Sequence, residues 1–131
     1  MFIDIDADAA RDPEVVERGE YEVQVLGVDE EIRTSQNGNQ YITVRCALVG
    51  VPYAEDIYHN LFLPDSNLEE RRNNKRLLQW KAVVDAFGLE KTSNGYNLQE
   101  LVGKTARAVV GEDRDQNDMP RNRIVRFLPE R

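Results

Sequence analysis

The sequence predicts a small, mainly β domain of five strands and one helix, and three observations lead to that prediction. Several segments alternate apolar and polar residues with period two, which is typical of strands with one buried face. One stretch, residues 75–87, has helical spacing instead. The pair Asn37-Gly38 lies between the first two alternating segments, and Asn-Gly is a strong hairpin signal because both residues accept positive φ angles.

The first two strands are predicted to form a hairpin over residues 21–50, closed by a type I′ turn at residues 35–39. In its second arm the core face should carry Ile42, Val44, Cys46 and Leu48. The opposite face should carry Tyr41, Thr43, Arg45 and Ala47. Gly27, midway along the first arm, predicts a bend or bulge there.

A third strand is predicted over residues 56–63, where Pro64 ends it because proline has no N–H for the ladder. A helix follows, with Asp65 or Ser66 as its N-cap and Gly88 as its terminator. Its apolar stripe should comprise Leu77, Trp80, Lys81, Val84 and Phe87. Trp80 is expected to anchor the core, since a tryptophan on such a stripe is usually buried.

Two further strands are predicted, over residues 104–110 and 121–128, after a short helical segment at residues 98–103. The resulting order is three strands, a helix and two strands. That order predicts a five-stranded Greek-key barrel of the oligonucleotide/oligosaccharide-binding (OB) type, with the helix between strands 3 and 4. A ferredoxin-like fold would require a helix after the first strand, and none is available there.

The domain is predicted to span residues 19–131, preceded by an acidic N-terminal arm at residues 1–18 with a short helical turn around residues 13–18. The net charge of −7 is concentrated at this end: residues 1–31 hold eleven acids and two bases, and the remainder holds thirteen acids and fifteen bases. Net charge therefore does not exclude nucleic acid as a partner. The arm is either a solvated lead-in, or an interaction segment that competes with nucleic acid or docks on a partner.

Four stretches in this order resemble a group of bacteriophage replication-module proteins: residues 19–23, residues 36–41, residues 77–89 and residues 101–104. The resemblance covers about residues 19–128. It implies an OB-fold protein that binds single-stranded DNA in phage replication or recombination, in the cytoplasm of a bacterial host cell.

A single-strand binder needs a basic groove for the backbone and aromatic faces for the bases. In OB domains that surface lies on strands two and three and on the loops between strands one and two and between strands four and five. The candidates on the strands and the first loop are Arg33, Asn37, Asn39, Tyr41, Arg45 and Tyr58. The candidates near other loops are Tyr53, Arg107, Arg121, Arg123 and Arg126. Phe62 is expected in the core.

No enzyme activity is predicted. His59 is the one histidine and falls on the apolar face of its strand, and Cys46 reads as a small core residue. Residues 113–118 resemble the start of an EF-hand loop, but Asp118 stands where a glycine belongs and Ile124 where the bidentate glutamate belongs. We therefore expect no catalytic residues, no metal and no cofactor.

Two functions of different classes remain open. The first is sequence-tolerant binding of single-stranded DNA, and the second is a protein-interaction module of a phage replication or assembly complex. Either could involve phage or host replication proteins and a homo-oligomer. The chain lacks an apolar run of membrane-spanning length and a secretory signal, so no membrane association is expected.

Overall fold

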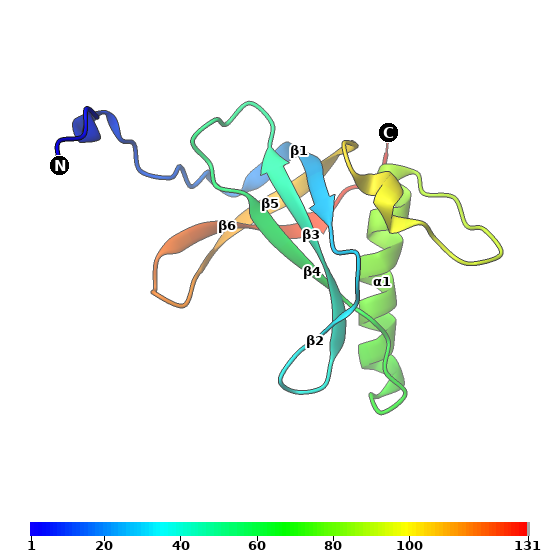
Figure 1. Cartoon of the computed structure of the whole chain (residues 1–131). Coiled ribbons are helices and arrows are strands. Elements are labelled where there is room, and N and C mark those ends of the chain that lie inside the picture. The colour runs from blue at the N-terminus through cyan, green and yellow to red at the C-terminus, as the bar shows by residue number, and fades with distance from the viewer. Residues whose placement is uncertain (131) are drawn as a thin grey trace.

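Six antiparallel strands in one sheet and a single α-helix make up the fold in the computed structural model, which describes residues 1–130 (Figure 1). The elements in chain order are η1 (Ala7–Ala9), β1 (Gly19–Val28), β2 (Arg33–Thr34), β3 (Gln40–Leu48), β4 (Ile57–Phe62), α1 (Glu70–Phe87), η2 (Leu98–Leu101), β5 (Thr105–Arg114) and β6 (Pro120–Phe127). The mainly β class and the position of the helix were predicted correctly. Neither α1 nor the short helical turns could cross a membrane, being too short or too polar.

The number of strands was predicted wrongly, because Arg33–Thr34, expected in the first loop, form the additional short strand β2. The sheet order is β2-β3-β1-β5-β6, and β4 pairs with β3. β4 occupies one edge of β3, so β1 and β2 share the other, β1 beside residues 44–48 and β2 beside residues 40–41. Between them the Asp29 N–H still donates to the Thr43 carbonyl, while its carboxylate accepts from the Thr43 N–H. β2 therefore continues the course of β1 after an excursion of the backbone.

The predicted closure into a barrel is not confirmed, because the sheet is open between its outer strands β4 and β6. These strands nevertheless lie next to each other, and side chains connect them. The His59 ring of β4 meets the Phe127 ring of β6 edge-on at 5.4 Å, and Phe127 also meets Phe87 of α1 at 5.2 Å. We call this contact region, formed by His59, Phe87 and Phe127, the seam.

The core follows the alternation expected for β3. Ile42, Val44, Cys46 and Leu48 are all buried, and the residues between them are not. Burial, with the charge of Asp56 as a smaller cause, raises the pKa of the Cys46 thiol to about 12, so it is a core residue and not a reactive thiolate. The bulge predicted at Gly27 is also present, as a register shift between Val25 and Gly27.

The hairpin turn is not the predicted type I′ turn. Gly38 has a φ of 82°, but Asn37 does not have the positive φ that a type I′ turn requires. The Gly38 N–H donates to the Ser35 carbonyl, and the Ser35 N–H to the Asn39 carbonyl. The turn therefore uses one left-handed residue and not two.

The N-cap of α1 is Glu69, four residues after Asp65 and three after Ser66, the two predicted caps, because other hydrogen bonds hold the segment before the helix. The Asp65 N–H donates to Asn73 Oδ1 and the Asp65 carbonyl accepts from Asn73 Nδ2. Gly88 ends the helix as predicted, with a φ of 66° and its N–H bonded to the Val84 carbonyl. Leu77 and Lys81 were wrongly assigned to the apolar stripe, since the helix turns Trp80 and Phe87 toward the sheet. Leu77 is 52% exposed, and Lys81 forms an exposed ion pair with Asp85.

The N-terminal arm docks on the sheet as extended chain, not as the helical turn predicted around residues 13–18. The Val16 N–H donates to Asn122 Oδ1 at 2.9 Å, and Asn122 Nδ2 donates to the Glu14 carbonyl at 3.1 Å. The Glu14 N–H donates to the Tyr53 carbonyl. The Glu14 carbonyl, which a helical turn over residues 13–18 would pair with the Arg18 N–H, is bonded to Asn122 instead. Residues 1–10 are exposed and carry the short turn η1.

The seam gives the protein a source of acid sensitivity. Burial, together with the positive charge of Arg123, lowers the pKa of His59 from 6.5 to about 4. As the pH falls, His59 of the unfolded chain is therefore protonated below about pH 6.5, whereas His59 of the folded chain is protonated only near pH 4. The free energy of unfolding therefore falls between these two pH values, by up to about 1.4 kcal/mol per pH unit.

We expect His59→Phe, which keeps an aromatic ring against Phe127, to reduce this loss. Between about pH 7 and pH 4.5 the free energy of unfolding of the variant should fall by about 1–2 kcal/mol less than that of the wild type. Urea unfolding of both proteins at the two pH values measures the difference. Parallel losses in the two proteins would mean that carboxylates alone cause the acid sensitivity.

Candidate nucleic-acid interface

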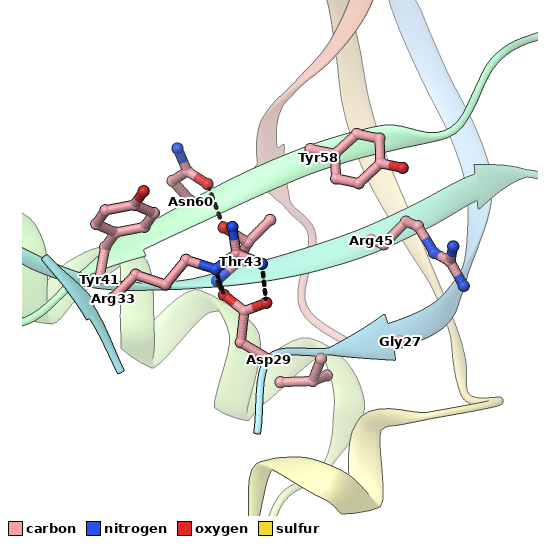
Figure 2. A pocket seen from close by; sticks show the side chains of 9 residues that line it. Gly27, Asp29, Arg33, Tyr41, Thr43, Arg45, Tyr58 and Asn60 are labelled. Carbon is pink, nitrogen blue, oxygen red and sulfur yellow. Dashed lines mark hydrogen bonds and ion pairs between the residues drawn. The ribbon is translucent and has the colours of Figure 1, made fainter. Parts of the chain in front are cut away.

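A hollow of about 480 Å³ lies on the outer face of β1, β3 and β4 (Figure 2). We call it the central hollow. Its lining residues are Gly27, Val28, Asp29, Arg33, Tyr41, Thr43, Arg45, Tyr58 and Asn60. Four residues predicted from the sequence, Arg33, Tyr41, Arg45 and Tyr58, meet there, although they come from three different strands.

The pairing of β3 with β4 determines which side chains share this face. Arg45 stands opposite Tyr58, and Thr43 stands opposite Asn60. The Thr43 hydroxyl donates to Asn60 Oδ1 at 2.7 Å, which fixes the middle of the hollow. Thr43 and Asn60 were not predicted as site residues, although the alternation places both on the same faces as the predicted tyrosines.

Gly27 keeps one side of the hollow open. It pairs with Arg45 across β1 and β3, and a Cβ atom at Gly27 would lie 3.7 Å from Arg45 Nη2. Any longer side chain would therefore occupy the space in front of the guanidinium. The glycine leaves Arg45 accessible from the hollow.

A carboxylate lies near each arginine of the hollow, but only Arg33 is hydrogen-bonded to its carboxylate. Asp29 accepts from Arg33 at 2.9 Å and, through its other oxygen, from the Thr43 N–H at 2.9 Å. The Arg45 guanidinium lies 3.9 Å from Asp56, and both side chains are more than one-third exposed. Such a long, exposed ion pair contributes little energy, so a phosphate can replace Asp56 at small cost.

The two tyrosines present ring surface at opposite ends of the hollow (Figure 2). Tyr58 is 66% exposed, so at least one of its faces is free to stack. Tyr41 is half-buried and leans on Phe62, with ring centroids 5.3 Å apart. Phe62 was expected in the core, but it is half-buried on the outer face, because it stands opposite Tyr41 in the register.

A second hollow adjoins the first at Tyr58 and contains Arg121 and Arg123. Its acidic lining residues are Asp12, Glu14, Glu55, Asp56, Asp113 and Asp115. Arg121 donates to Asp113 at 2.7 Å, and this bond raises the pKa of Arg121. With six carboxylates around two guanidiniums, the second hollow is a poor phosphate site, and part of its wall is the docked arm.

The remaining predicted residues lie outside these two hollows. Arg107 forms an ion pair with Glu20, and Arg126 of β6 stands opposite Val109 of β5. Tyr53 has Arg11 of the arm over its ring at 5.3 Å, and Asn37 is exposed at the hairpin tip. Asn39 is half-buried and accepts from Arg76 Nη2 at 2.9 Å.

The EF-hand-like segment is a turn. Asp115 Oδ1 accepts from the N–H groups of Asn117 and Met119, and Asp118 has a φ of 60°. Within residues 1–130 no group of three or more His, Cys, Asp or Glu side chains is arranged to hold a metal ion.

A comparison with known proteins gives a family but no activity. The model of a family described as a protein of unknown function, DUF669, matches residues 3–128. The chain belongs to the DUF669 family. No curated protein matches it.

For this DUF669 protein, the chemistry of the hollow therefore has to be derived from its residues. An exposed phenol ring offers a stacking surface to any base, and the guanidiniums offer N–H donors to phosphate oxygens. The bond between them uses the Thr43 hydroxyl as donor and Asn60 Oδ1 as acceptor. The Asn60 Nδ2 group keeps its two N–H donors, which are the main polar contact that the middle of the hollow offers to a base.

Proposed function

We propose that this DUF669 protein is an OB-type domain that binds single-stranded DNA without strong sequence preference. The observation that carries the proposal is the meeting of Arg33, Tyr41, Arg45 and Tyr58 in the central hollow. Stacked bases contribute roughly 1–3 kcal/mol each, and cations along the groove hold the phosphates. The alternation of the strands puts both kinds of group on one surface.

The strand order supports an OB-type architecture. With β2 counted as a continuation of β1, the order is β4-β3-β1-β5-β6, so the sheet runs from the third main strand through the second, first and fourth to the fifth. A Greek-key barrel has this order and closes between the third and fifth strands, where this protein has its seam. The central hollow lies on the second and third main strands, the surface that OB domains use for oligonucleotides.

The proposed biological setting is phage DNA replication or recombination in the cytoplasm of a bacterial host. The resemblance of residues 19–128 to phage replication-module proteins supports this setting. In it, the protein would coat single strands that other replication proteins expose.

Titration of labelled oligonucleotides tests the proposal. Single-stranded DNA of about 4–16 nucleotides should bind in a salt-sensitive way, with a slope of log K against log salt near −0.7 per phosphate contacted. Duplex DNA of the same sequence should bind more weakly, because its bases cannot reach the tyrosine rings. RNA of the same sequence tests whether the sugar matters. The proposal fails if no single strand binds at about 50 mM salt, or if the affinity does not fall as the salt concentration is raised.

A protein-interaction module is the second candidate, and the first residues of the arm favour it. Phe2, Ile3 and Ile5 are exposed among aspartates, and a segment of this kind gains energy by burial on a partner. Capture of one specific protein, unaffected by nuclease and by alanine at Tyr41 and Tyr58, would support this candidate against DNA binding.

A further inference from the structure

A third hollow lies where the first turns of α1 approach the hairpin and the end of β4. We call it the helix hollow. Its lining residues are Asn39, Phe62, Leu68, Arg72, Lys75, Arg76 and Gln79. Three of these are basic and none is acidic, in contrast to the second hollow, where carboxylates outnumber guanidiniums.

The cations of the helix hollow are available to bind an anionic ligand. Arg72 and Lys75 are exposed, and within residues 1–130 neither has a carboxylate within 4.0 Å. Arg76 is half-buried and held in place, donating to the Leu63 carbonyl at 2.7 Å and to Asn39 Oδ1 at 2.9 Å. Cations without a nearby carboxylate, such as Arg72 and Lys75, can neutralise the phosphates of a nucleic-acid backbone, and the fixed Arg76 lies beside them.

The helix hollow is joined to the central hollow by a row of rings. Tyr41 lines the central hollow, Phe62 lines the helix hollow, and their ring centroids are 5.3 Å apart. The Arg76 guanidinium lies over the other end of this row, 5.4 Å from the Phe62 centroid. Tyr58 and Phe62 are four residues apart on β4, so the row extends the stacking surface by about 13 Å.

Resting on the proposed function, we infer that the single strand leaves the central hollow past Tyr41 and continues over Phe62 onto Arg72 and Lys75. The opposite direction, from Tyr58 toward Arg121 and Arg123, leads into the acidic second hollow and past the docked arm. The ligand of the helix hollow is thus the sugar-phosphate backbone of a strand too long for the central hollow alone.

The test is the double variant Arg72→Ala/Lys75→Ala, measured against oligonucleotides of about 4 and about 12 nucleotides. For the wild type, lengthening the strand should raise the affinity and steepen the salt dependence. The variant should bind the short strand as the wild type does and bind the long strand about 10-fold more weakly. Its salt slope for the long strand should be smaller by about 1.4, the value for two phosphates. Alanine favours helix, so α1 should remain folded, which circular dichroism checks.

The matched control is Arg71→Ala/Lys91→Ala, which removes the same charge from exposed residues outside the helix hollow. The inference is overturned if the helix-hollow variant binds the long strand normally, or if the control loses as much affinity. A length-dependent loss in Arg121→Ala/Arg123→Ala instead would show that the strand runs the other way. Wild-type protein that binds no strand at either length would overturn the proposed function itself.

Discussion

Replacing both Tyr41 and Tyr58 with alanine should weaken the binding of single-stranded DNA by at least about 30-fold. Alanine substitution of a stacking residue costs roughly 1–3 kcal/mol per base, and 1.4 kcal/mol corresponds to a factor of ten. Tyr58 should account for more of the loss, because it is 66% exposed and Tyr41 is half-buried against Phe62. The side chains lie at opposite ends of the hollow, so their effects should nearly add.

The salt dependence gives this prediction a second readout. Tyrosine carries no charge at neutral pH, so the double variant should bind more weakly at every salt concentration while the slope of log K against log salt stays unchanged. Tyr58→Phe, which keeps the ring, should bind within about 2-fold of the wild type. Tyr96→Ala is the matched control, since Tyr96 is 43% exposed but lines none of the three hollows. Unchanged affinity in the Tyr41/Tyr58 variant would contradict stacking in the central hollow.

The central hollow could be predicted from the sequence because strand alternation carries most of its information. Once β3 and β4 are recognised as strands, period two places Tyr41 and Arg45 on one face and Tyr58 on the matching face of its neighbour. What alternation does not contain is the register. Only the pairing of Arg45 with Tyr58 shows that the predicted residues meet at one place.

The helix hollow could not be predicted in the same way. The helical spacing of residues 75–87 defines an apolar stripe that includes Trp80, and Arg72 and Lys75 lie off that stripe. Their significance depends on the tertiary contact that brings α1 to the end of β4, where Trp80 Nε1 donates to the Phe62 carbonyl at 2.9 Å. Likewise, Arg121 and Arg123 were predicted as nucleic-acid-binding residues from their charge alone, but the fold surrounds them with carboxylates, several of them distant in sequence.

The interruption between β1 and β2 and the open sheet both arise from long-range interactions. No local pattern at Asp29 predicts that its carboxylate will bond the Thr43 N–H fourteen residues away. Similarly, each outer strand has ordinary strand alternation, and whether the two form a ladder depends on how α1 and the rings of the seam fill the space between them.

The seam should be the most sensitive point of the fold. Phe127→Ala should lower the free energy of unfolding by about 3–5 kcal/mol, because Phe127 is 4% exposed and its ring contacts both His59 and Phe87. That loss is a large fraction of the roughly 5–15 kcal/mol typical of a domain. Urea unfolding at neutral pH measures it, and Phe2→Ala, the same change at a fully exposed position, should alter stability by less than about 0.5 kcal/mol.

The size of the loss also tests whether side chains alone hold β4 against β6. If side chains alone join the strands, removing the central ring leaves a cavity with no backbone ladder to resist separation, and Phe127→Leu should recover part of the stability. A loss below about 1 kcal/mol for Phe127→Ala would contradict this. Because His59 and Tyr58 are adjacent on β4 and face opposite sides, a loosened seam should also misplace Tyr58. Single-stranded DNA should therefore bind Phe127→Ala more weakly than the wild type even under conditions where the variant remains folded.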